Sequence, residues 1–179
     1  MILISHSSSF QDGTRVLFLK GRYKDGIKKQ RTITRITHNA EEHDTALREL
    51  SKLAEEGERI YGSAEPRCLK AAARYFKIAM IESDYVNDYK FWERIDRRWE
   101  SALMQPTSRD PGYPKFWLFD CDNGEADELI RVIPAEQTPH YRYSTKNGEH
   151  VLTQGFDKRV LPPHLEKIRN DNPLMLWGY

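Results

Sequence analysis

The feature that most constrains the fold of this chain is an apolar run that ends in two aspartates. Residues 115–121, KFWLFDC, form the most apolar stretch of the sequence, and Asp122 follows directly. A short apolar run of this kind predicts a buried strand at the centre of a sheet. Burying an unpaired charge costs several kcal/mol. Asp120 and Asp122 are therefore the first candidates for a functional site.

The spacing of Asp120 and Asp122 predicts a divalent-metal site. Side chains at i and i+2 of a strand lie on the same face, so the two carboxylates would repel each other. A divalent cation relieves that repulsion, and oxygen ligands suit Mg²⁺ or Mn²⁺, which bind phosphates through their open positions. A plainer interpretation stays open, in which Asp120 ends the strand and residues 122–124 form a turn.

A second polar group lies further along the chain, in residues 144–150, STKNGEH. Its Asn-Gly pair separates two β-prone segments, which predicts a hairpin. Lysine and serine suit phosphate oxygens, and histidine can donate to a phosphate. The candidate nucleotide-binding side chains of the hairpin are Ser144, Lys146, Asn147 and His150. We expect His150 to lie within about 10 Å of the Asp120 carboxylate, because neighbouring strands are about 5 Å apart.

Arg67 is a further candidate ligand for a nucleotide. It ends the segment SAEPR, at residues 63–67, just where a helix is predicted to begin. Free backbone amides at a helix start, together with an arginine, can bind a phosphate. Helix capping explains the same residues equally well.

The remaining patterns alternate between strand and helix. Strands are predicted at residues 15–20, 32–37, 59–62, 141–145, 150–153 and 174–177. Helices are predicted at residues 40–56, 66–82, 88–104, 125–133 and 162–170. Asn39 followed by Glu42 forms a capping box, which predicts the start of the first of these helices. The order β-α-β-β-α-β in the second half resembles a ferredoxin-like arrangement. The predicted class is α/β (α+β), with a mixed sheet, a ferredoxin- or RRM-like second half and an N-terminal α/β portion packed on it.

Length and composition predict one globular domain. The chain has 179 residues, of which 39% are hydrophobic and 31% charged. A loop rich in proline at residues 105–114 predicts a division into sub-lobes 1–104 and 115–179. Cys68 and Cys121 have no CxxC partner, which argues against a four-ligand zinc site.

Charge and hydropathy restrict the kinds of partner and the location that we expect for this protein. The net charge is +1, from 28 Lys and Arg against 27 Asp and Glu. The overall charge therefore does not by itself indicate a nucleic-acid partner. The N-terminus lacks a signal-peptide pattern, and no run approaches the ~18 apolar residues of a membrane span. We therefore expect a cytoplasmic protein without a membrane partner.

The two polar groups together resemble the archaeo-eukaryotic primase superfamily, which includes the primase-polymerases. That family is marked by an apolar strand ending in Asp-x-Asp or Asp-x-Glu, then a small-residue segment ending in His, then a later acidic residue. FWLFDCD is similar to the first element and STKNGEH to the second. Asp171 is the candidate for the third element, and Asp157 is a weaker choice. The resemblance covers residues 115–179.

The resemblance implies a metal-dependent nucleotidyltransferase. Asp120 and Asp122, with Asp171, would hold two Mg²⁺ or Mn²⁺ ions, and His150 would contact the incoming nucleotide. The implied partners are nucleoside triphosphates, a single-stranded DNA or RNA template, and a helicase or other replication protein.

Two other functions stay open. One is a nucleic-acid-binding or regulatory protein that keeps this fold without turnover, because the third acid is not clearly marked. The other is a haloacid-dehalogenase-like phosphatase, whose nucleophile motif is also an apolar run ending in Asp-x-Asp. Only 57 residues follow Asp122, and they contain no Asp-Asp pair to hold the metal, which disfavours the phosphatase.

Overall fold

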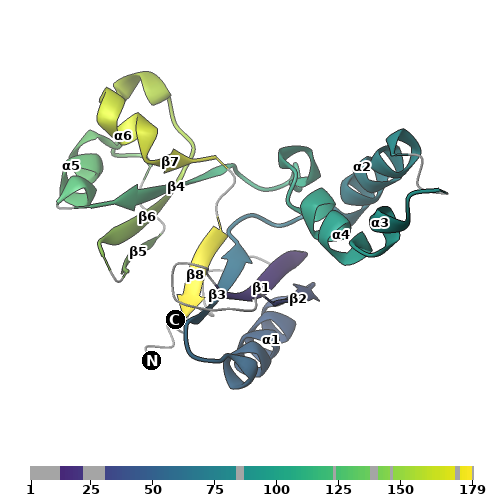
Figure 1. Ribbon diagram of the computed structural model, residues 1–179. Helices are drawn as coiled ribbons and strands as arrows, with labels where there is room; N and C mark the ends of the chain where they lie inside the picture. The colour runs from purple at the N-terminus through teal and green to yellow at the C-terminus, as the bar shows by residue number, and fades with distance from the viewer. Residues whose placement is uncertain are drawn as a thin grey trace. The chain divides into compact units, whose positions relative to one another are not determined.

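The structure is a computed structural model that describes residues 13–21, 31–83, 87–122, 124–137, 141–145, 147–171 and 174–178. The chain divides into two compact units, and each is described by itself (Figure 1). The first falls within Met1–Pro111 and Leu174–Tyr179, and the second within Gly112–Pro173. The division after Pro111 lies inside the predicted loop, whereas the last strand returns to the first unit.

The first unit contains a four-stranded antiparallel sheet. Its strands are β1 (Arg15–Gly21), β2 (Thr32–Thr37), β3 (Glu58–Ser63) and β8 (Leu174–Gly178), in the order β2-β1-β3-β8. The predicted strands at 15–20, 32–37 and 59–62 are confirmed. The final strand is also confirmed, but it pairs with β3 and not with the strands of the second half.

Helices complete the first unit. They are α1 (Ala40–Leu53), α2 (Leu69–Glu82), α3 (Tyr89–Trp92) and α4 (Ile95–Leu103), followed by the 3-10 turn η2 (Pro106–Ser108). The Asn39 side chain accepts from the Glu42 N–H at 2.9 Å, which confirms the capping of α1. Helices α2 and α4 contribute Ala72 and Leu103 to a core shared with β1.

The three predicted helices of this unit were wrong in their bounds, and the first of them ends at Leu53 and not at residue 56. The backbone of Arg67 forms a bridge to Arg109 and donates to the Thr14 carbonyl, so residues 66–68 are extended and α2 begins only at Leu69. The single helix predicted for 88–104 breaks into α3 and α4. Its supposed apolar face does not form one stripe, because Phe91 is fully buried while Ile95 is 37% exposed.

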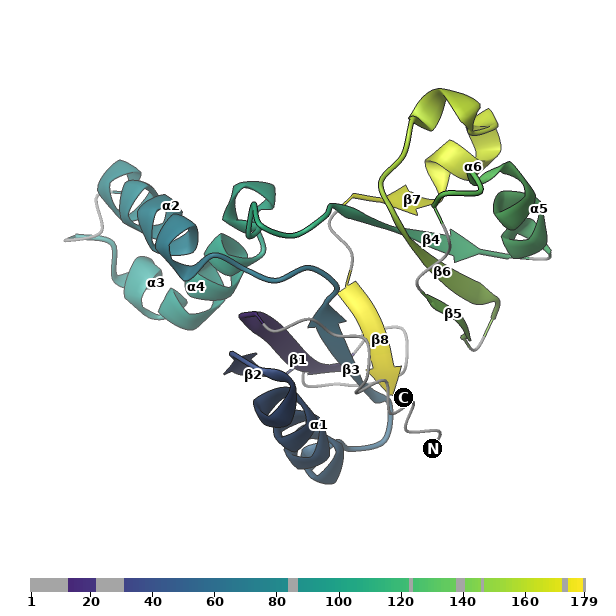
Figure 2. The same ribbon diagram turned by 180° about the vertical axis from the view of Figure 1, so that it is seen from behind.

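The second unit has the ferredoxin-like arrangement. Its elements are β4 (Phe116–Cys121), α5 (Glu125–Val132), β5 (Tyr141–Ser144), β6 (Glu149–Gln154), η3 (Lys158–Val160), α6 (Pro163–Lys167) and β7 (Arg169–Asn170). The strand order is β5-β6-β4-β7, with β4 inside the sheet as predicted. Helices α5 and α6 lie on the same side of this sheet in Figure 1 and, from behind, in Figure 2.

The α+β class is therefore confirmed, but the expected mixed sheet was wrong. All strand pairs within the described residues are antiparallel. The reason is that β6 lies between β4 and β5, which run in the same direction, so these parallel strands are never neighbours. The predicted helix 162–170 also ends early, because Leu118 and Phe119 pair with Asn170 and Arg169 to form β7.

Alternation along β4 separates its apolar and acidic side chains. Trp117, Phe119 and Cys121 are buried in one cluster with the residues of α5 and α6. Leu118 and Asp120 therefore lie on the face turned away from those helices. Within the described part of the chain, no helix is both long and apolar enough to cross a membrane.

Candidate active site

The acidic pair, Asp120 and Asp122, lies at the end of the central strand of the second sheet. Asp120 is the penultimate residue of β4, and its side chain is 75% exposed. Asp122 follows the strand and is also exposed. Two carboxylates thus stand at the water-accessible end of a strand whose other side chains are largely buried.

Gly148 brings the neighbouring strand close to Asp122. A Cβ atom at this glycine would lie 2.8 Å from Asp122 Oδ1 and 2.3 Å from the Cys121 carbonyl oxygen. Since Cys121 pairs with Glu149, Asp122 lies beside Gly148 just as Asp120 lies beside His150. The acidic pair therefore occupies successive positions on one face, about 7 Å apart along the strand. This arrangement agrees with the predicted common face.

Three side chains form a hydrogen-bonded row across β5, β6 and β4. Tyr143 pairs with His150, and His150 pairs with Asp120. His150 Nε2 lies 3.0 Å from Asp120 Oδ1, and His150 Nδ1 lies 2.9 Å from the Tyr143 hydroxyl. The expected proximity of His150 to Asp120 is confirmed. We call these three residues the Tyr–His–Asp row.

The environment of His150 favours a neutral imidazole. Its side chain is only 16% exposed, and burial lowers the pKa of His150, while the Asp120 carboxylate offsets part of that shift. A carboxylate can only accept, so the hydrogen of the ring lies on Nε2 and is donated to Asp120. Nδ1 then accepts from the Tyr143 hydroxyl, and both ring nitrogens are satisfied.

The strand end carries a negative potential. The pKa of the buried Cys121 thiol is raised to about 12, first by burial and then by Glu125, Asp120 and Glu149. One nearby cation, Arg142, acts in the opposite direction. It binds Glu149 with two hydrogen bonds, of 2.9 and 2.6 Å, and also reaches Asp127 at 2.8 Å. The carboxylates around the strand end thus favour the approach of a cation.

The acidic pair fits Mg²⁺ or Mn²⁺ only as part of a shared site. Among the described residues, no three His, Cys, Asp or Glu side chains are grouped to hold a metal ion. Magnesium, however, is commonly bound by one or two carboxylates together with water and substrate phosphates. Asp120 and Asp122 could supply those carboxylates, and the phosphates of a nucleotide would supply the rest.

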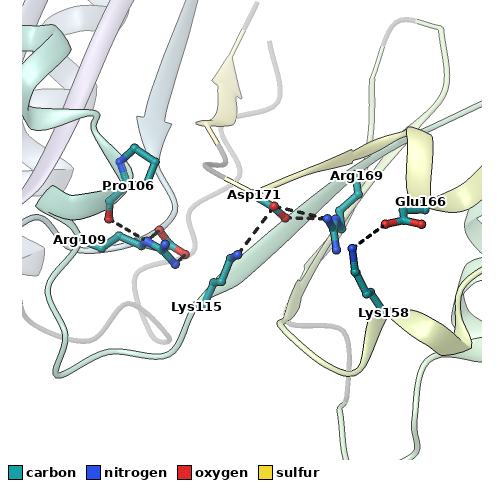
Figure 3. Close-up of polar contacts among 8 residues, drawn as sticks. Pro106, Arg109, Lys115, Lys158, Glu166, Arg169 and Asp171 are labelled. Atoms are coloured by element: carbon teal, nitrogen blue, oxygen red, sulfur yellow. Dashed lines mark hydrogen bonds and ion pairs between the residues drawn. The ribbon is translucent and has the colours of Figure 1, made fainter.

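Asp171, the predicted third acid, does not lie beside the acidic pair. It follows Asn170, which pairs with Leu118, so it lies level with Trp117 and about 10 Å along β4 from Asp120. Its carboxylate contacts Arg169 at 3.1 Å and Lys115 at 3.8 Å. Figure 3 draws both contacts. The weaker choice, Asp157, caps η3 and is paired with Arg159, which lowers its pKa to about 2.

The hairpin forms as predicted, and its residues have different positions. The Thr145 N–H donates to the Gly148 carbonyl at 2.8 Å and closes the turn between β5 and β6. Asn147 is exposed in this turn, and Ser144 is exposed at the end of β5, opposite Glu149. By alternation Ser144 lies on the other face from His150. Lys146 lies outside the described residues.

Arg67 belongs to the first unit and not to the second sheet. It is 1% exposed, and burial lowers its pKa to about 10. This burial differs from the accessible position that a phosphate ligand would need.

Tyr143 is the member of the row that the sequence did not reveal. Two tyrosines, Tyr141 and Tyr143, alternate along β5, and nothing in that pattern distinguishes them. Only the register of β5 against β6 selects Tyr143 as the partner of His150.

Comparison with known proteins leaves the family open. No match was found for this chain among protein-family models, curated proteins or solved structures.

Proposed function

We propose that this protein is a divalent-metal-dependent nucleotidyltransferase of the primase-polymerase kind. The observation that carries the proposal is the acidic pair on one face of a central strand, with His150 hydrogen-bonded to Asp120 at 3.0 Å. The ferredoxin-like unit around it supports the same proposal. The substrates would be nucleoside triphosphates and the 3′ end of a strand paired to a single-stranded DNA or RNA template.

Each residue of the site has a role in this proposal. Asp120 and Asp122 hold Mg²⁺ or Mn²⁺ together with the triphosphate. When bound, the metal activates the attacking hydroxyl and neutralises charge on the leaving pyrophosphate. His150 holds Oδ1 of Asp120, which leaves the second carboxylate oxygen for the cation. Asn147, exposed in the hairpin turn, is available to the nucleotide.

A non-catalytic binding protein is the second candidate, and one observation favours it. Asp171 is engaged by Arg169 and Lys115, so the third acid that two-metal catalysis would use is not at the strand end. In both candidates the location proposed is the cytoplasm, with a helicase or other replication protein as a further partner.

Metal binding is tested by thermal unfolding with and without Mn²⁺. A ligand that binds only the folded state stabilises it by about 1.4 kcal/mol at a tenfold excess over its Kd. The melting temperature of the wild type should rise, and Asp120→Ala with Asp122→Ala should abolish the rise. The matched control removes two other exposed carboxylates, Glu56 and Glu136, and should retain it. No rise in the wild type at millimolar Mn²⁺ would contradict the nucleotidyltransferase, and it would also contradict a binding protein that retains the metal site.

Turnover separates the two candidates. Wild-type protein with Mn²⁺, nucleoside triphosphates and a primed single-stranded template should release pyrophosphate and extend the primer. The double variant should do neither. Stabilisation by Mn²⁺ without pyrophosphate release would favour the binding protein.

A further inference from the structure

Tyr143 is held in place more firmly than a surface residue of an edge strand would be. It lies on β5, pairs in register with His150, and is 7% exposed. Its ring packs edge-on against the imidazole, with centroids 5.1 Å apart and planes at 71°. Water therefore has little access to the hydrogen bond between the Tyr143 hydroxyl and Nδ1.

The two hydrogen bonds of His150 hold one tautomer together. The Asp120 carboxylate can only accept, so the ring hydrogen lies on Nε2 and is donated at 3.0 Å, and Nδ1 accepts from the Tyr143 hydroxyl at 2.9 Å. The opposite tautomer would turn a lone pair of Nε2 toward a carboxylate and lose this bond. Partners of this kind commonly orient a metal ligand without touching the metal.

We propose that Tyr143 is a positioning residue, which fixes the Nε2–H tautomer of His150 and thereby the orientation of the Asp120 carboxylate toward a divalent cation. Cation binding at Asp120 depends on the proposed function, whereas the effect of the Tyr143 hydroxyl on the tautomer of His150 does not. Oδ1 is committed to His150, so the row leaves one defined oxygen of Asp120 for the metal.

Nuclear magnetic resonance of ¹⁵N-labelled histidine side chains tests the first step without metal or substrate. The shifts of Nδ1 and Nε2 distinguish the two tautomers, and a His150→Gln variant assigns the signals. The wild type should show the Nε2–H tautomer at neutral pH. A wild-type Nδ1–H tautomer would overturn the proposal before any other variant is made.

The Tyr143→Phe variant tests the rest, because it keeps the ring that packs on His150 and removes only the hydroxyl. The signals of His150 should shift toward a mixture of tautomers, and Mn²⁺ affinity should fall about tenfold. Mn²⁺ affinity is measured by electron paramagnetic resonance of the free ion. The matched control is Tyr141→Phe on the same strand, which lies opposite Leu152 and should change neither readout.

The outcomes separate the two proposals. Unchanged His150 signals in Tyr143→Phe would overturn the positioning role, as would changed signals with unchanged Mn²⁺ affinity. A wild type that does not bind Mn²⁺ would contradict the proposed function. If its His150 signals still depended on Tyr143, the hold on the tautomer would stand without the metal.

Discussion

His43 in the first unit and His150 in the second are both shielded from water, but their neighbours differ. Burial and the cation of Arg15 lower the pKa of His43 to about 4. Burial also lowers the pKa of His150, but there the Asp120 carboxylate offsets part of the shift. The first histidine is packed as a neutral core residue near Thr37, and the second is joined to an exposed carboxylate. The neighbours, and not the residue type, make His150 the candidate for chemistry.

Two buried charges of the first unit, at Arg15 and Glu58, differ in the same way from the acidic pair of the second unit. Arg15 in the first unit is buried and donates to the Ala64 carbonyl at 2.8 Å, which ties β1 to the end of β3. Glu58 is buried and accepts two hydrogen bonds from Arg31. In the second unit, Asp120 and Asp122 are exposed at a strand end. These buried charges of the first unit therefore hold elements of its fold together, whereas the exposed carboxylates of the acidic pair can meet a ligand from solution.

The largest loss of stability is expected at Arg67, a buried charge of the first unit. Arg67→Ala removes one of the largest fully buried side chains of the protein. It should lower the free energy of unfolding by about 3–5 kcal/mol, measured by chemical denaturation. Arg48→Ala, at an exposed position of α1, is the control and should cost well under about 1 kcal/mol. A stable Arg67→Ala protein that binds nucleotide more weakly than the wild type would instead favour Arg67 as a nucleotide ligand.

The second-largest effect is expected at His43, when the pH is lowered. Its folded pKa of about 4 lies below the ordinary value of 6.5, so the unfolded chain binds the proton first as the pH falls. Stability from this group is complete above about pH 6.5 and declines to a loss of about 3 kcal/mol at pH 4. His43→Gln should show a flatter dependence of the unfolding free energy between these pH values. Equal slopes would mean that His43 is not buried as a neutral group.

A third prediction sharpens the comparison at the strand end. Gly148→Ala places a Cβ within 2.3 Å of the Cys121 carbonyl oxygen, so the backbone must shift. We expect a loss of about 1–3 kcal/mol in unfolding free energy, together with weaker Mn²⁺ binding because Asp122 is displaced. Gly155→Ala is the matched control in the same unit, since its Cβ would meet Trp117 at an ordinary 3.5 Å. Similar losses in both variants would argue against the close approach.

The smallest effect on stability is expected at the site itself. Asp120→Ala should change the unfolding free energy by less than about 1 kcal/mol without metal, because the carboxylate is exposed. The same variant should lose Mn²⁺ stabilisation. A large loss of stability without metal would show that Asp120 is a structural residue, like the buried charges of the first unit.

Local patterns in the sequence determined several parts of this protein. The apolar run before Asp120 predicts the central strand, and Asn39 with Glu42 predicts the start of α1. The Asn-Gly pair predicts the hairpin between β5 and β6. These features depend on residues within a few positions of one another, where backbone geometry and turn chemistry act directly. The spacing of Asp120 and Asp122 predicts a common face for the same reason.

Only the tertiary structure decided which residues meet across the sheet. Register is set by packing over whole strands, and a shift of one residue would turn every side chain of a strand to the other face. The meeting of Tyr143, His150 and Asp120 depends on two such registers, so no local pattern predicts it. The same long-range pairing commits Asn170 to β7 and places Asp171 beside Trp117, away from the acidic pair. Sequence periodicity identifies the strands, but the packing of distant segments determines their partners.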